Sequence, residues 1–318
     1  MKLLFLRGQV PQDRDPAEIC HACACGEDDV WTWLAMGLGD EQSELVYWGG
    51  KRYISYNDKF SIRWVKNLAE YECPFKPDVI FARGGFPEYE PVLRRYAGAY
   101  KIYYGAGKRY KPEGYQDYNL ILTDSVQQQK NLNQILKEKS ALWVKPAAPL
   151  FYPTGAEKRY DVGYVADGRF EHRAKIKGVD FVYSTIPDDL SLLHLGWAKK
   201  NVRKHSTIVR VNRTEMPGML SECRVGIIPY TDYDSAPRCL PEMLACDVPV
   251  VVSDRLNIWR EMYVNEHTGA VANKDNFWET VRRVMSLNLK PAAYYKEHLS
   301  LDAAVRRLKG LISGAKSN

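Results

Sequence analysis

The chain has 318 residues, of which 45% are hydrophobic and 26% are charged, and its formal net charge is +6. This composition excludes a disordered, collagenous or fibrous chain, and the length predicts about two domains, each large enough for its own core. No apolar run approaches the roughly 18 residues of a membrane span. The first seven residues are typical of a β-strand rather than of a secretion signal, so we expect a cytoplasmic protein.

Short apolar or aromatic runs alternate with helical periodicity through the first half of the chain. The expected strands are 2–8, 44–48, 77–84, 101–105, 120–124 and 141–145, and the expected helices are 28–38, 61–72, 88–96 and 125–137. Near-continuous apolar runs such as 79–82 are typical of strands that are buried on both faces. The first half therefore predicts a parallel sheet.

Pro146, Pro149 and Pro153 cluster with Gly155 and mark a linker. Strand and helix signals then resume, with strands at 160–166, 190–195, 208–211, 224–230 and 248–254 and helices near 177–184, 215–223 and 238–246. We expect an α/β protein with two Rossmann-like, doubly wound domains that face a cleft. The expected domains are 1–148 and 149–318, with the last helix packing back on the N-terminal domain. Ligands of such sheets lie beyond the carboxyl ends of the strands.

The most informative stretch follows the strand that ends at Tyr230. A polar loop leads into a helix whose start, between Pro237 and Pro241, has free backbone amides. Such amides can hold an anion. Asp234 in the loop and Glu242 on the helix bracket this point, and each carboxylate can accept hydrogen bonds from the vicinal hydroxyls of a sugar.

This stretch resembles the family-4 type of retaining nucleotide-sugar glycosyltransferases, which have the two-domain GT-B fold. That family has two acids spaced E-x7-E, a helix that reads roughly LEAMACG, and then PVV-x-S-D. Asp234 and Glu242 have this spacing, and residues 249–254 read PVVVSD. The resemblance implies that Glu242 binds the ribose of the donor nucleotide and that Asp234 contacts the transferred sugar. The first acid is Asp rather than Glu, and Asp247 stands where the family has Gly.

Residues 162–169 and 177–180 resemble the family run V-G-R-L…K-G-V-D, whose Arg and Lys bind the donor diphosphate. The resemblance assigns this role to Arg169 and Lys177. The gap between them is longer than usual, which leaves Arg173 or Lys175 as alternatives for the second cation.

Three more residues are candidates for binding the donor. Gly8 follows the first strand and fits a close approach of backbone to phosphate, although a plain turn explains it as well. Ser235 and Arg238 lie beside the start of the helix that carries Glu242. These acids and cations also have explanations without a function, because acids at helix starts and cations in solvated loops are common.

Arg169, Lys177 and a helix start can stabilise a nucleotide diphosphate leaving group without a metal, so we expect no metal requirement. Cys20, His21, Cys23 and Cys25 lie close together but lack the spacing of a structural zinc site. Retention of the anomeric configuration is implied by the resemblance. The sequence names no nucleophile, because residues 83–85 read RGG where the family has a histidine.

The expected reaction moves a hexose, with UDP-glucose as the expected donor, to an acceptor hydroxyl. Basic residues interleave with tyrosines between Lys101 and Tyr115, a pattern of nucleic-acid grooves and also of sugar or lipid surfaces. The N-terminal layout resembles phage-type glycosyltransferases. We therefore expect double-stranded phage DNA with 5-hydroxymethylpyrimidines as the acceptor, in the host cytoplasm. The alternatives are a saccharide or lipid acceptor of envelope assembly, or a module that binds nucleotide-sugar or nucleic acid without catalysis.

Overall fold

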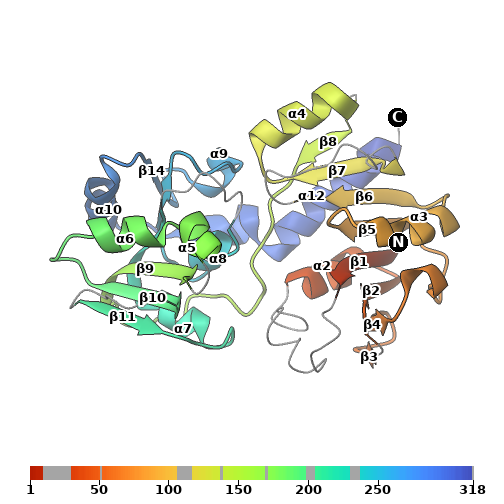
Figure 1. Ribbon diagram of the computed structural model, residues 1–318, viewed down its shortest axis with the longest axis horizontal. Coiled ribbons are helices and arrows are strands. Elements are labelled where there is room, and N and C mark those ends of the chain that lie inside the picture. The colour runs from red at the N-terminus through yellow and green to blue at the C-terminus, as the bar shows by residue number, and fades with distance from the viewer. Residues whose placement is uncertain are drawn as a thin grey trace. The chain divides into compact units, whose positions relative to one another are not determined.

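The computed structural model describes residues 1–9, 30–50, 52–105, 117–136, 139–168, 171–197, 205–229 and 237–316. By the contacts between its residues, the chain divides into two compact units (Figure 1). Unit 1 comprises Met1–Trp143 and Ala304–Asn318, and unit 2 comprises Val144–Ala303.

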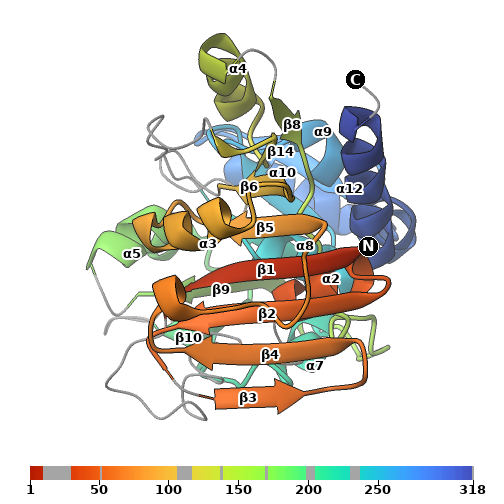
Figure 2. The same cartoon turned by 90° about the vertical axis from the view of Figure 1, so that its right-hand side faces the viewer.

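Unit 1 is built on an eight-stranded sheet with the order β3-β4-β2-β1-β5-β6-β7-β8. The strands are β1 (Lys2–Gln9), β2 (Gln42–Trp48), β3 (Arg52–Ser55), β4 (Phe60–Val65), β5 (Val79–Arg83), β6 (Tyr100–Tyr104), β7 (Leu120–Thr123) and β8 (Ser140–Leu142). Every neighbouring pair is parallel except the edge hairpin of β3 and β4. Figure 2 shows β3, β4, β2, β1, β5 and β6 side by side in this order.

Helices of unit 1 cover both faces of its sheet. They are α2 (Val30–Leu38), η2 (Leu68–Glu70), η3 (Pro87–Tyr89), α3 (Glu90–Arg95), α4 (Val126–Leu136) and the part of α12 (Leu301–Lys316) that begins at Ala304. Leu4 and Leu6 of β1 belong to one core cluster with residues of α3 and α4. Phe5, which alternates with them, packs on Trp31 of α2 with ring centroids 5.9 Å apart. The burial of both faces explains the continuous apolar runs in the sequence.

The helix expected at 61–72 is wrong. Residues 60–65 form strand β4, in which buried and half-buried residues alternate, and only a short 3-10 turn follows. Arg63 Nε donates to the buried Glu44 carboxylate of β2 at 2.6 Å, and Tyr71 also donates to it. Burial raises the pKa of the Tyr71 hydroxyl. The period of two and the β-branched and aromatic residues were the signals that favour a strand here.

Unit 2 contains a six-stranded sheet in which every neighbouring pair is parallel. The strands are β9 (Tyr160–Asp167), β10 (Leu192–Trp197), β11 (Ser206–Val209), β12 (Cys223–Ile228), β13 (Val250–Ser253) and β14 (Gly269–Ala272). Their order, β11-β10-β9-β12-β13-β14, is the doubly wound order 3-2-1-4-5-6. Both units thus confirm the expected α/β class with two Rossmann-like domains.

Eight helical elements lie wholly within the described residues of unit 2. They are α5 (Glu171–Lys177), α6 (Val179–Thr185), α7 (Met216–Ser221), α8 (Cys239–Ala245), α9 (Arg260–Tyr263), α10 (Phe277–Ser286), α11 (Pro291–Tyr294) and η5 (Tyr295–Leu299). Of these, α5, α7, α8 and α10 contact strands of its sheet. Gly178, at φ 69°, separates α5 from α6 within the region expected to hold one helix. A Cβ at Gly226 of β12 would lie 2.4 Å from Met243 Sδ of α8, so a larger residue there would require the Met243 side chain to move.

Candidate functional site

The strand order of unit 2 reverses between β9 and β12, which are adjacent in the sheet. Ligands of doubly wound sheets bind outside the carboxyl ends of the strands at this point. A pocket of about 340 Å³ lies there, a size within the range of small-molecule sites. It is lined by Val165, Ala166, Lys177, Leu195, Gly196, Trp197, Arg210, Val211, Arg213, Met216, Arg238, Cys239 and Glu242.

Glu242 contributes a carboxylate to this pocket. It lies on α8, in which every residue is buried, and only 2% of its own surface is exposed. A buried carboxylate needs a hydrogen-bonding partner of opposite charge. Arg213, in the loop after β11, provides one, because its Nη2 lies 2.6 Å from Glu242 Oε1. The Arg213 guanidinium in turn packs over the Phe151 ring, 4.8 Å from its centroid.

Positive charge dominates the described lining of the pocket. Lys177, Arg210, Arg213 and Arg238 contribute four cations, and Glu242 contributes the single carboxylate. The four cations suit a ligand that carries more than one negative charge. The carboxylate can accept hydrogen bonds from hydroxyl groups of the same ligand. A nucleotide diphosphate has both groups.

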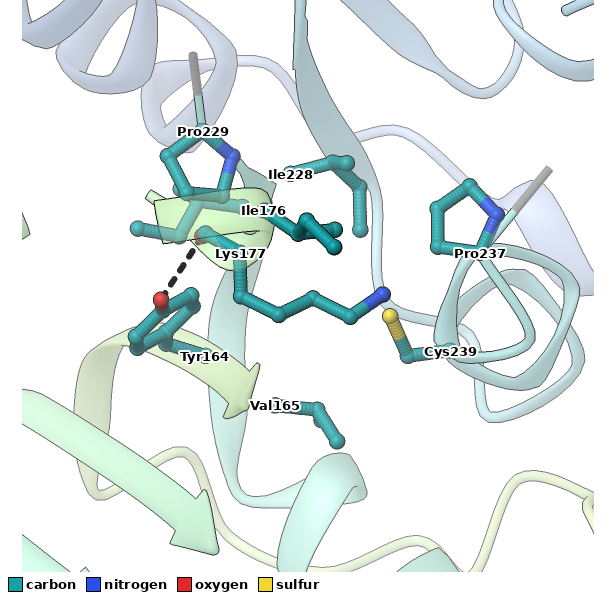
Figure 3. Close-up of a pocket in the computed structure, with 9 residues that line it drawn as sticks. Tyr164, Val165, Ile176, Lys177, Ile228, Pro229, Pro237 and Cys239 are labelled. Atoms are coloured by element: carbon teal, nitrogen blue, oxygen red, sulfur yellow. Dashed lines mark hydrogen bonds between the residues drawn. The ribbon is translucent and has the colours of Figure 1, made fainter. Parts of the chain in front are cut away.

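Lys177, the last residue of α5, reaches into the site from the side opposite to α8. Figure 3 shows its side chain extended toward Cys239, the first residue of α8. The Tyr164 hydroxyl of β9 donates to the Lys177 carbonyl oxygen at 2.8 Å, which fixes the end of α5 over the sheet. Arg238 is exposed and lies directly before α8. The structure therefore brings Lys177, Arg238 and Glu242 to one pocket.

A buried histidine links two strands that line the pocket. His194 of β10 is 0% exposed, and burial lowers its pKa, which keeps the imidazole neutral. Its Nε2 lies 3.0 Å from the carbonyl oxygen of Ala166, so this nitrogen carries the proton and donates it. Nδ1 then accepts from the Tyr183 hydroxyl at 2.6 Å. This network joins β9 to β10 at the point where both reach the pocket.

The structure describes only one of the remaining candidates for donor binding, Gly8. Asp234, Ser235 and Arg169 fall outside the described residues, as do Cys20–Cys25 and most of the basic and tyrosine-rich stretch after Lys101. Gly8 belongs to unit 1, where it stands at an irregularity in the pairing of β1 with β2 and has φ 134°.

Cations and aromatic rings gather around Gly8 at the carboxyl ends of the unit 1 strands. Arg7 and Arg83 lie at the ends of the neighbouring strands β1 and β5. Their guanidinium carbons lie 5.9 Å and 5.4 Å from the ring centroid of Trp31. The strand order of unit 1 also reverses between β1 and β5, so this edge is the position in unit 1 that corresponds to the pocket of unit 2.

Sequence reasoning missed Arg213, Arg210 and Trp197. Trp197 ends β10, and Arg210 and Arg213 follow β11. Their position at the carboxyl ends of parallel strands was the only signal in the sequence that could have indicated a site. Among the described residues, no group of three or more His, Cys, Asp and Glu side chains is placed to hold a metal ion. None of the helices in the described parts of the chain has the length and apolar character needed to cross a membrane.

No family model matches the chain, and no curated protein matches it. Solved structures match it over nearly its full length. Sucrose-phosphate synthase from Thermosynechococcus elongatus has a TM-score of 0.68 and 10% identity, with 99% of both chains covered. A glycosyltransferase from Rickettsia africae has a TM-score of 0.65 and 11% identity, with 100% of this chain and 99% of that chain covered.

HepE from Anabaena, solved in complex with UDP, has a TM-score of 0.62 and 12% identity, with 99% of this chain and 100% of that chain covered. A second structure of HepE contains UDP and glucose. These neighbours share the GT-B fold. At such identities the likeness concerns the fold, and it confirms that this chain folds as a GT-B protein.

Proposed function

We propose that this GT-B chain is a glycosyltransferase that takes a hexose from a uridine diphosphate sugar, with UDP-glucose as the donor. The observation that carries the proposal is the pocket at the switch point of unit 2, where one buried carboxylate lies among four cations. Neighbours of the same fold that hold UDP, and UDP with glucose, support this choice of donor.

In the proposed complex the ribose hydroxyls donate to Glu242, whose carboxylate is held in the pocket by Arg213. Lys177 and Arg238 hold the diphosphate, together with Arg169. Asp234 contacts the transferred sugar, as the sequence resemblance implies. Ser235, the next residue in the sequence, contacts the donor. Gly8 of unit 1 is proposed to approach a phosphate of the donor through its backbone.

During transfer, the bond between the anomeric carbon and the diphosphate oxygen breaks, and negative charge grows on the leaving UDP. Cations that are fixed before the reaction stabilise this charge without reorganising. The Tyr164 hydroxyl donates to the Lys177 carbonyl oxygen and so fixes the backbone from which the Lys177 side chain extends. We propose that the reaction retains the anomeric configuration and requires no metal. Proton NMR of the product distinguishes the α-linked sugar expected of retention from a β-linked one.

For the acceptor we propose 5-hydroxymethylpyrimidines in double-stranded phage DNA. Lysines and an arginine alternate with tyrosines between residues 101 and 115. The cations suit the phosphates of a duplex, and the tyrosines can stack on a base that is flipped out of it. The acceptor assay compares labelled glucose transfer to hydroxymethylated DNA, to plain DNA of the same sequence, and to saccharide and lipid acceptors. Transfer to hydroxymethylated DNA alone is expected. A protein that hydrolyses the donor but glycosylates only saccharide or lipid would reject the DNA acceptor.

The donor is tested by titration calorimetry with UDP and by hydrolysis of UDP-glucose. Replacing Glu242 by Gln should weaken UDP binding about tenfold, because a charge-assisted hydrogen bond to the ribose is lost. Glu266→Gln is the matched control, since that carboxylate is 82% exposed and outside the pocket. UDP-glucose that binds tightly without hydrolysis or transfer would contradict an enzyme and favour a binding module.

A further inference from the structure

Trp197 is exposed, which is unusual for tryptophan, the amino acid with the largest side chain. Among the described residues it is the only tryptophan classed as exposed, with 41% of its surface accessible. It ends β10, whose preceding residues Leu192, Leu193 and Leu195 are buried in the core of unit 2. The indole therefore contributes little to that core. Instead it lines the pocket that also contains Glu242.

Arg210 places a cation against this indole. Its guanidinium carbon lies 5.4 Å from the ring centroid, within the range of a cation–π contact. Arg210 comes directly after β11, the strand beside β10, and lines the same pocket. Together the two side chains present planar groups to a pocket whose other described charged groups are Lys177, Arg213, Arg238 and Glu242.

The backbone that carries Trp197 is held in a conformation that favours glycine. Gly196 has φ 141°, and a Cβ there would lie 1.8 Å from the carbonyl oxygen of Ala166. The same carbonyl accepts the Nε2 proton of His194 at 3.0 Å, and the amide of Gly168 donates to the Trp197 carbonyl at 2.8 Å. These contacts fix the end of β10, so the backbone that carries the indole is already in place before any ligand binds.

We propose that Trp197, with Arg210 against its ring, is the platform on which the nucleobase of the donor stacks. This assignment rests on the proposed function, since it places the base at one end of the pocket and the ribose at Glu242. Aromatic and guanidinium faces stack with any nucleobase, because every base has a π-face. The platform therefore binds the nucleoside part of the donor and does not choose between bases.

The test measures the affinities of UDP, ADP and inorganic pyrophosphate for the full chain by calorimetry. Trp197→Ala should bind UDP and ADP about tenfold more weakly, while its affinity for pyrophosphate, which has no base, stays within about twofold. Trp197→Phe keeps a stacking face and should lose less. Tyr152→Ala is the control, because Tyr152 is 57% exposed in the same unit but outside the pocket.

Intrinsic fluorescence gives a second signal. Stacking of UDP on the indole should quench the wild-type emission, and Trp197→Phe should remove that change while calorimetry still detects UDP binding. Equal UDP affinity of wild type, Trp197→Ala and Trp197→Phe, with the quench unchanged, would overturn the platform and leave the donor proposal standing. Failure of the wild-type chain to bind UDP would overturn both.

Discussion

Arg213 and Glu242 form an ion pair within unit 2, with Arg213 Nη2 2.6 Å from Glu242 Oε1. The side chains are 19% and 3% exposed, so water screens their attraction only weakly. The pair joins the loop after β11 to helix α8 and holds the carboxylate at the wall of the pocket. The arginine thus acts on the proposed ribose site through the glutamate that it orients.

Replacing Arg213 by Ala should destabilise unit 2 by about 3 kcal/mol, because it leaves the Glu242 carboxylate buried without its partner. Glu242→Gln should cost less, since a neutral amide has a smaller desolvation penalty. Urea unfolding followed by circular dichroism measures both.

The double variant Arg213→Ala with Glu242→Gln should recover part of the loss of Arg213→Ala, because no buried charge then remains unpaired. Additive effects in this cycle would show that the two side chains do not interact. Lys309→Ala controls for loss of a surface cation, because its partner Asp40 is exposed.

The sequence predicted the two parallel sheets because their strands are buried on both faces, and such strands leave continuous apolar runs such as 79–82. It failed at 60–65, where β4 lies next to the sheet edge and polar residues alternate with apolar ones. The polar Ser61 and Arg63 face Glu44 of β2, a partner that only the folded sheet brings close.

The candidate site was predicted only in part. Glu242 and Lys177 lie in a recognisable motif, and the structure places both at the pocket. Arg213 and Trp197 are distant from that motif in sequence, and only the parallel order of β10 and β11 next to β9 brings them there. Their roles depend on tertiary contacts, which no local pattern encodes.

The burial of His194 predicts that acid destabilises unit 2. Burial lowers the pKa of this imidazole below its ordinary 6.5, so the unfolded chain takes up a proton more readily than the folded one. The resulting contribution to stability is complete at pH above about 6.5 and is lost as the pH falls through that value toward the folded pKa. Melting curves at intervals from pH 7.5 to 5 should show a falling Tm.

His194→Gln can still donate to the Ala166 carbonyl but cannot be protonated, so the part of the Tm change caused by His194 should disappear in this variant. His205→Gln is the control, because His205 is exposed. The same acid slope in wild type and His194→Gln would contradict this explanation.

Gly196→Ala should be one of the most harmful single-methyl additions in unit 2. The new Cβ would overlap the Ala166 carbonyl oxygen, and φ 141° is unfavourable for alanine, so we expect a loss of about 2 kcal/mol or more. UDP affinity should fall with it, since β9 and β10 meet at the pocket.

Gly218→Ala provides the contrast. A Cβ there meets no atom within 4 Å, and the residue lies in helix α7. Alanine favours a helix, so this variant should be more stable by about 0.5–1 kcal/mol. The result that would refute the account is a Gly196→Ala protein as stable as Gly218→Ala.

Asp247 occupies the position at which the resembling family has glycine, and the structure gives the reason for both residues. It has φ 58°, the left-handed conformation that costs glycine least. Asp247 also has a second role, because its Oδ1 accepts the amide proton of Ala292 in the first turn of α11 at 3.0 Å. The carboxylate therefore offsets the strain of its own backbone.

Asp247→Ala should lose about 1–2 kcal/mol, since it removes the hydrogen bond and keeps the strained φ. Asp247→Gly loses the same bond but relieves the strain, so it should stay within about 0.5 kcal/mol of wild type. Chemical denaturation of both variants measures the difference. A glycine variant as unstable as the alanine variant would show that the capping bond alone matters.

The central claim is that the pocket beyond β9 and β12 holds the nucleotide of a sugar donor. Crystals of the full chain grown with UDP test it most directly, because the density locates the ribose and the diphosphate. The account predicts ribose hydroxyls within hydrogen-bonding distance of the Glu242 carboxylate and phosphates beside Lys177. UDP bound outside this pocket, or bound in it with Glu242 still engaged only by Arg213 and distant from the ribose, would contradict it.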